Sequence, residues 1–291
     1  MVKFGPSGNS NSFYSDGNTK SEQAFEWLSR KGLDAYEYSF GRGINISDAK
    51  AETMRDNAKA NGVEISVHAP YYINFANPDE EMIQKSIGYV INSAKKARVL
   101  GANRVVFHSA TVGKLDRKQA FDLCSARFDM LVDAIYKNGF ENMFFCPETM
   151  GKINQIGDEK EIALLCVKDK CFLPAIDFGH LNARTLGGLK TEEDFKQVVD
   201  NVLDIVGERA KSMHIHFSKI EYTKGGEVRH LTFSDNTYGP DFLPLANVIY
   251  KYSLSPVVIC ESDGTQAEDA LYMKKIFNEV VNYNEISRTH F

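Results

Sequence analysis

The fold is decided by residues 64–108, which read EISVHAPYYINFANPDEEMIQKSIGYVINSAKKARVLGANRVVFH. A short run rich in β-branched residues, Glu64–His68, is followed by Glu81–Leu100, where apolar residues recur every three or four positions. Gly101 ends this helical segment, as glycine commonly does. A second β-branched run, Arg104–His108, comes next. The stretch therefore predicts one β-α-β unit of a parallel sheet.

The same alternation of strand and helix runs along the whole chain. The expected strands are Val2–Gly5, Ala35–Phe40, Glu64–His68, Arg104–His108, Met143–Glu148, Phe172–Asp177, Ser212–Phe217 and Pro256–Glu261. The expected helices are Ser21–Lys31, Ser47–Asn61, Glu81–Leu100, Asp116–Lys137, Asp158–Lys168, Thr191–Val206, Asp241–Tyr252 and Gln266–Val281. Eight such units in 291 residues predict an α/β protein, a single (β/α)₈ TIM barrel. No linker rich in Pro, Gly or Ser divides the chain, so we expect one domain over residues 1–291.

Composition limits the function classes. Apolar residues make up 43% and charged residues 25% of the chain, as in ordinary globular proteins. No apolar run approaches the roughly 18–20 residues of a membrane span, and the first eight residues lack the apolar core of a signal peptide. The five cysteines form no C-x-x-C pair, which favours a reducing compartment. We therefore expect a cytoplasmic monomer without a membrane partner.

Residue types that bind metal ions stand where the expected strands end. These residues are His68, His108, Glu148, Asp177, His214, His216 and Glu261, while His180 and His230 lie in the following loops. Six of the seven histidines fall at these places, and His290 in the tail is the exception. Active sites of this fold lie at the C-terminal ends of the strands, so the pattern predicts a metal site there.

The ligand types and their number indicate the chemistry. Imidazole and carboxylate without thiolate suit Zn, Mn, Fe or Co. One divalent ion needs about three or four protein ligands, so this many candidates indicate two or three ions. Ions about 3.5–4 Å apart can activate water and stabilise a phosphoryl displacement, which favours cleavage of a phosphodiester. The long stretch Ser218–Pro240 is expected to be an irregular loop that carries function.

At these residues the sequence resembles the endonuclease IV family of abasic-site DNA repair enzymes, which are (β/α)₈ barrels with three zinc ions. The matching segments are His68–Asn74, Val106–His108, Pro147–Thr149, Ile176–His180, Met213–Ile215, Arg229–His230 and Cys260–Glu261. The resemblance implies a metal-dependent hydrolase of base-excision repair. It would cut the phosphodiester 5′ to an abasic site, and its expected partner is damaged double-stranded DNA.

The resemblance also implies roles for the ligand residues. The first zinc would take His68, His108 and the catalytic Glu148, and Glu148 would bridge to a second zinc held by Asp177, His214 and Glu261. His180 and His230 would hold the third zinc. The family has an aspartate two residues before the loop histidine, where this chain has Val228, so the adjacent Glu227 is the candidate substitute. The expected cofactor is two or three Zn²⁺, with Mn²⁺ or another divalent ion as the alternative.

Three further positions match residues through which the family contacts DNA. They are Arg42, Tyr71 and Tyr72, which would enter the minor groove beside the flipped-out abasic nucleotide. Their alternative roles are a solvated loop charge for Arg42 and packing aromatics for the two tyrosines. Possible phosphate contacts are Lys114, Arg117, Lys219, Lys224 and Arg229. His216 stands where the family tends to have Asn, and it either competes with His214 as a ligand or supports the ligands from outside.

A competing hypothesis uses the same barrel. Sugar isomerases and epimerases of the xylose isomerase-like superfamily also carry Glu, Asp, His and Glu at successive strand ends. Here Glu148, Asp177, His214 and Glu261 would bind one Mn²⁺ or Co²⁺, and two carboxylates would exchange a proton beside a sugar carbonyl. His68, His108, His180 and His230 favour the nuclease, because a mononuclear epimerase does not need them as ligands. A metal-binding barrel without catalysis is a third alternative.

The net charge of −5 argues against binding DNA through bulk charge alone. Two or three divalent ions would add four to six positive charges at the barrel mouth, and bound ions dominate local electrostatics. The charge therefore predicts weak non-specific DNA binding without excluding a DNA substrate.

Overall fold

The computed structural model describes residues 1–289, and His290 and Phe291 lie outside this part of the chain. Two four-stranded parallel sheets form its centre, in the orders β1-β12-β9-β8 and β2-β3-β4-β6. Their strands are β1 (Lys3–Pro6), β2 (Ala35–Ser39), β3 (Glu64–His68), β4 (Arg104–Phe107), β6 (Phe144–Pro147), β8 (Ala175–Asp177), β9 (His214–Phe217) and β12 (Val257–Cys260). Parallel bridges Ser7–Glu37 and Glu148–Ala175 join the sheets at both edges. The ring is therefore closed, and the predicted TIM barrel is confirmed.

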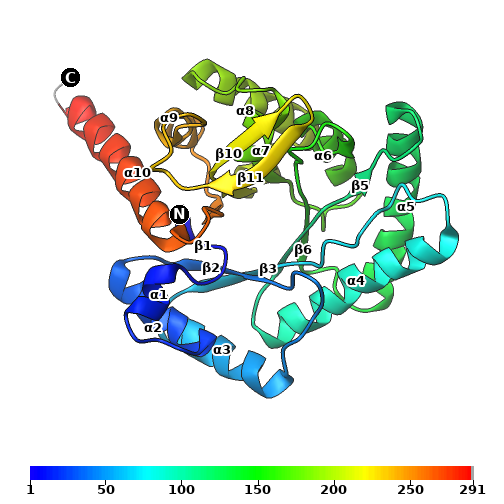
Figure 1. The fold of residues 1–291 in the computed structure, drawn as a ribbon, viewed down its shortest axis with the longest axis horizontal. Coiled ribbons are helices and arrows are strands. Elements are labelled where there is room, and N and C mark those ends of the chain that lie inside the picture. Colours follow the sequence, from blue (N-terminus) through cyan, green and yellow to red (C-terminus); the bar gives the residue numbers. More distant parts are fainter. Residues whose placement is uncertain (290–291) are drawn as a thin grey trace.

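Helices surround this ring (Figure 1). They are α1 (Asn11–Ser15), α2 (Ala24–Lys31), α3 (Asp48–Ala60), α4 (Glu80–Val99), α5 (Arg117–Lys137), α6 (Glu159–Cys166), α7 (Phe178–Arg184), α8 (Glu192–Val206), α9 (Phe242–Lys251) and α10 (Gln266–Thr289), with 3-10 turns at Ser21–Gln23 and Glu208–Ser212. Local signals set their ends: Thr191 forms a capping box with Asp194, and Gly32 closes α2 with a φ of 81°. No helix of the described residues has the length and apolar character to span a membrane.

The loop between β9 and α9 is more ordered than predicted. It contains an antiparallel hairpin of β10 (Lys219–Thr223) and β11 (Gly226–Leu231), which lies over one side of the barrel end (Figure 1). The expectation of an irregular loop was wrong because Lys224 and Gly225 provide a tight two-residue turn between two short strand segments. A second pair, β5 (Ala110–Thr111) with β7 (Gln155–Ile156), joins the loops after β4 and β6.

The barrel interior is layered. Apolar side chains form two small clusters, one of Ala35, Val257 and Ile259 and the other of Val106, Cys146, Leu173 and Ala175. Inward positions of β2, β3 and β9 are instead polar and buried, including Glu37, Ser66 and His214. A Cβ on Gly5 would lie 1.7 Å from the Ala35 carbonyl oxygen, so only glycine allows β1 to approach β2 this closely. All five cysteines are free and buried.

Candidate metal centre

Two histidines from neighbouring strands converge on one carboxylate oxygen. The Nε2 atoms of His68 and His108 lie 3.1 and 3.2 Å from Glu148 Oε2. His68 Nδ1 donates to the Ala69 carbonyl at 2.8 Å. Because carbonyl and carboxylate oxygens only accept, both ring nitrogens of His68 donate in the metal-free protein, and Nε2, on the side of Glu148, is the atom that would be free for a metal. Three ligand atoms within 4.8 Å of one another form the first group.

The second group shares Glu148 with the first. It comprises Glu148, Asp177, His216 and Glu261. His216 Nδ1 lies 3.0 Å from Glu148 Oε1 and 3.5 Å from Glu261 Oε2. Asp177 Oδ1 accepts from the His180 N–H at the start of α7 at 2.8 Å. Its Oδ2 is buried and accepts no hydrogen bond from any residue that the structure describes. An unsatisfied buried carboxylate oxygen in such a group fits a cation.

The third group joins His180 of the barrel to Glu227 and His230 of the β10–β11 hairpin. His180 Nδ1 donates to the Thr149 carbonyl at 2.9 Å, which turns its Nε2 toward Glu227 Oε2 at 3.5 Å. His230 joins them from β11, and its Nδ1 lies 2.8 Å from Ser218 Oγ. The ligand atoms of His180, Glu227 and His230 again lie within 4.8 Å. Glu227 thus occupies the place for which the sequence offered it as a substitute, while Val228 is half exposed.

Two glycines let the hairpin come this close. Gly226 has a φ of +90°, and a Cβ there would lie 2.1 Å from the Gly151 carbonyl oxygen. A Cβ on Gly151 would lie 2.6 Å from Glu227 Cβ. The Glu227 N–H donates to the Gly151 carbonyl at 3.2 Å. Backbone contact at side-chain-free positions therefore sets the position of Glu227.

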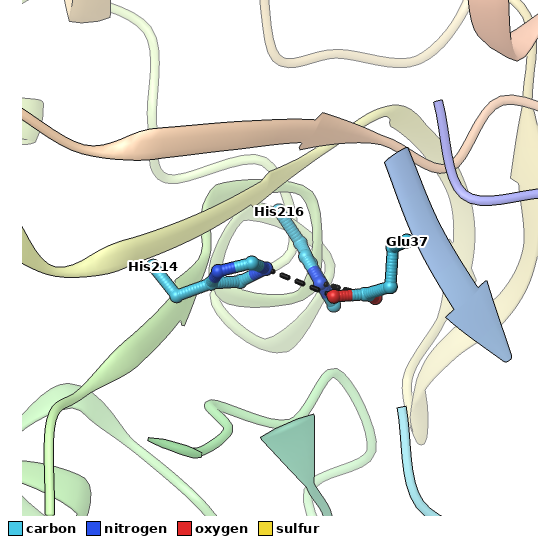
Figure 2. Close-up of side chains that lie close together, drawn as sticks. All are labelled: Glu37, His214 and His216. Atoms are coloured by element: carbon cyan, nitrogen blue, oxygen red, sulfur yellow. Dashed lines mark ion pairs between the residues drawn. The ribbon is translucent and has the colours of Figure 1, made fainter. Parts of the chain in front are cut away.

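The structure separates the two histidines of β9. His216 lies in the second group, where the sequence had offered His214, and His214 lies apart from the Glu148 carboxylate in a buried group with Glu37 and His216 (Figure 2). Both side chains point inward, but positions two apart on a strand differ by about 6.5 Å along its axis. His216 is nearer the C-terminal end and reaches the mouth, whereas His214 stays one step deeper. The alternation of side chains along a strand predicted that His214 and His216 share one face, but it could not predict how deep each side chain lies in the barrel.

Glu37 is the site residue that the sequence reading missed. It is fully buried, and its carboxylate lies 3.0 Å from His214 Nε2 and 2.9 Å from His216 Nε2. The sequence feature that could have identified Glu37 is that it is the single acidic residue of the expected strand Ala35–Phe40, at an inward position. Burial by itself raises the pKa of Glu37, but His216 and His214 hold that pKa well below its usual range.

The charges of the centre are strongly coupled. Burial lowers the pKa of His68, but the facing Glu148 carboxylate outweighs it and raises that pKa to about 9. Burial likewise lowers the pKa of His108, which remains below the usual value despite Glu148. Burial raises the pKa of Asp177, and Glu261 and Glu148 add to this rise against the effect of His180. Crowded carboxylates of this kind favour a bound cation.

Each of the three groups contributes to the wall of a cavity of about 720 Å³: the first through His68 and His108, the second through Glu261, and the third through His180, Glu227 and His230. Of the predicted DNA-contact residues, Tyr71 lines this cavity, and its ring centre lies 5.8 Å from that of His108. Tyr72 faces Tyr89 instead, at 6.0 Å between ring centres. Arg42 is exposed on a turn in which the carbonyl of Gly41 accepts the Tyr71 N–H at 3.2 Å.

The candidate phosphate contacts are distributed unevenly. Arg229 lines the cavity and pairs with Glu221 at 2.7 Å. Arg117 is bound to the carbonyls of Ile153 and Gln155, and Lys219 donates to the Asp235 carbonyl. Lys114 and Lys224 are exposed. Lys152, which the sequence reading did not single out, also lines the cavity.

The fold and the three ligand groups define a (β/α)₈ barrel with a candidate divalent-metal centre at its mouth. Residues 25–276 match the model of the xylose isomerase-like TIM barrel family, and the chain belongs to this family. An uncharacterized protein of Methanocaldococcus jannaschii is 31% identical over 259 residues, or 89% of this chain and 92% of that protein. A probable endonuclease 4 of Mycoplasmoides gallisepticum is 25% identical over 250 residues, or 78% of this chain and 75% of that protein.

Solved structures from two enzyme classes resemble the barrel about equally. A D-tagatose 3-epimerase-like protein has a TM-score of 0.71 at 21% identity, over 98% of this chain and 99% of that one. Endonuclease IV from Thermus thermophilus has a TM-score of 0.68 at 19% identity, over 97% of this chain and 99% of that one. These similarities establish the fold alone.

Proposed function

We propose that the protein is a metal-dependent AP endonuclease that hydrolyses the phosphodiester 5′ to an abasic site in duplex DNA. The observation that carries the proposal is the junction of three ligand groups, two of which share Glu148. One ion does not need this many ligands, whereas phosphodiester cleavage uses several ions. The probable endonuclease 4 proteins of Mycoplasmoides gallisepticum and Acholeplasma laidlawii, at 25% and 28% identity, support it.

Each of the three ligand groups would hold one metal ion. His68, His108 and Glu148 would hold one Zn²⁺, Glu148 with Asp177, His216 and Glu261 a second, and His180, Glu227 and His230 a third. When bound, such ions activate water and stabilise charge on the phosphate and the leaving oxygen. Glu148 would fix the spacing of the first two groups, and Tyr71 would pack against the DNA beside the flipped-out nucleotide. We expect the enzyme to act in the cytoplasm as a monomer.

The test combines metal analysis with an incision assay. Zinc-loaded protein should contain at least three ions per chain and cut a duplex that carries one tetrahydrofuran abasic analogue, immediately 5′ to the lesion. An otherwise identical intact duplex is the control and should remain uncut. A fully metallated protein that leaves the lesion duplex intact would overturn the proposal.

The second candidate is a mononuclear sugar epimerase. Glu148, Asp177, His216 and Glu261 form a carboxylate-rich quartet of the kind that one Mn²⁺ or Co²⁺ takes, and two carboxylates could exchange a proton beside a carbonyl. The D-tagatose 3-epimerase-like structure favours this candidate. A single ion among the mouth groups, with interconversion of ketoses and no DNA incision, would establish it in place of the nuclease.

A further inference from the structure

A carboxylate and an imidazole lie buried below the three ligand groups of the mouth, against the His216 imidazole of the second group. Glu37 projects inward from β2, and His214 and His216 project toward it from β9 (Figure 2). All three residues have an exposed fraction of 0%. Ionised groups are rarely buried this deeply unless a counter-charge or a metal faces them.

The geometry of this group differs from that of a hydrogen-bonded network. Glu37 Oε2 accepts from Ser66 Oγ at 2.8 Å, and His214 Nε2 and His216 Nε2 lie 3.0 and 2.9 Å from the carboxylate oxygens. Yet Glu37 Oε1 and both Nε2 atoms lack a hydrogen-bond partner among the described residues. Distances of 2.9 and 3.0 Å are short enough for hydrogen bonds, so it is the angles between the rings and the carboxylate that do not meet hydrogen-bond geometry.

Unsatisfied buried polar atoms that surround a common point are typical of metal ligands. Asp177 Oδ2, in the second group, is unsatisfied in the same way. The distances of 2.9 and 3.0 Å in the deeper group resemble those of 3.1 and 3.2 Å in the first group. The two Glu37 oxygens face one ring each, so the carboxylate offers two ligand atoms.

We infer that Glu37, His214 and His216 form an additional metal site, buried in the barrel beneath the three groups at the mouth. Two imidazoles and one carboxylate, without thiolate, suit Zn²⁺ or Co²⁺. The site is closed to solvent, which is typical of a structural ion rather than of one that meets substrate. The inference does not depend on whether the mouth cuts DNA or epimerises a sugar.

His216 would connect this site with the mouth. Its Nε2 faces Glu37 and its Nδ1 faces Glu148. An imidazole that ligated through both nitrogens would carry no ring proton, so a neutral His216 ring would release one proton to solvent and a protonated ring two when both ions are bound. The deeper ion would then hold His216 in the orientation that the second group needs.

The experiment compares two variants of the deeper group with one of the mouth. Zinc-loaded wild type, Glu37→Gln, His214→Gln and His108→Gln are dialysed against EDTA and analysed for metal. We expect wild type and His108→Gln to retain one slowly exchanging ion per chain, and Glu37→Gln and His214→Gln to lose it. Far-UV circular dichroism and thermal unfolding establish that each variant is folded.

The direct readout uses wild type alone and does not depend on how the variants fold. A zinc anomalous map of the loaded protein should show a peak between Glu37, His214 and His216. No peak there, in crystals whose mouth sites are occupied, would overturn the inference. Folded Glu37→Gln and His214→Gln proteins that hold as many ions as wild type would also overturn it. If the protein does not cut the abasic duplex but the anomalous peak is present, the proposed nuclease function is wrong and the inferred buried site is still supported.

Discussion

The barrel strands and the β10–β11 hairpin bring ligands to the same cavity by different means. Strand ligands such as Glu148 and Asp177 are fixed by the pairing of parallel strands and are almost fully buried. The hairpin ligands Glu227 and His230 have side chains 16% and 26% exposed, and they depend on docking through Gly151 and Gly226. The strand-borne groups should therefore be the rigid part of the centre and the hairpin-borne group the part that can be removed separately.

The largest effect is expected at the shared strand ligand. Glu148→Gln removes one charged ligand from two groups at once, so incision should fall by at least about 10³-fold. Metal content should drop in both strand-borne groups. The measurements are steady-state incision of the abasic duplex and metal analysis. Glu52→Gln, on the exposed face of α3, is the matched control and should behave as wild type.

The next effect concerns docking of the hairpin. Gly226→Ala places a Cβ against the Gly151 carbonyl at a φ of +90°, so the hairpin must shift. We expect a loss of about 1–3 kcal/mol in stability and of one ion per chain. Gly225→Ala is the control, because the nearest atom to its Cβ is Thr223 Oγ1 at 3.8 Å. If Gly226→Ala retained its full metal content, the hairpin would not be a separable part of the centre.

Metal-free protein should show a pH-dependent stability from His68. Its pKa is raised from 6.5 to about 9, so its contribution is complete below pH 6.5 and is lost as the pH rises through 9. The contribution is about 3 kcal/mol. Urea unfolding of chelated wild type and His68→Gln at several pH values measures it. The stability difference between the two proteins should fall by about this amount as the pH rises through 9, and a constant difference would contradict the expected titration.

The smallest effect is expected for an aromatic residue on the cavity wall. Tyr71→Ala should leave metal content unchanged and weaken binding of the abasic duplex by about 1 kcal/mol, through lost packing against DNA. Fluorescence anisotropy with a duplex whose linkage 5′ to the lesion resists hydrolysis would measure binding without cleavage. Tyr72→Ala is the control, since Tyr72 packs against Tyr89 rather than the cavity. Equal effects of both substitutions would argue against a specific role for Tyr71.

Periodicity predicted the barrel well because it reflects local rules. The expected strand Glu64–His68 is the observed β3, and the expected helix Asp116–Lys137 differs from α5 by one residue. Strand Phe172–Asp177 was too long, since β8 begins at Ala175 after Pro174, which cannot donate to a sheet. The short helix α7 was missed because Asp177, which caps it, had been interpreted as a strand end and ligand only.

The sequence by itself determined the α/β alternation, the absence of a disulfide framework and the placement of histidines and carboxylates at strand ends. These features follow from residue type and from spacing along one strand or helix. Tertiary structure decided that His216 rather than His214 joins Glu148, that Glu227 meets His180, and that Glu37 lies between two histidines. Each of these depends on the depth of a side chain in a closed barrel or on the docking of a hairpin. Such distances join elements far apart in the chain, and no pattern within one element encodes them.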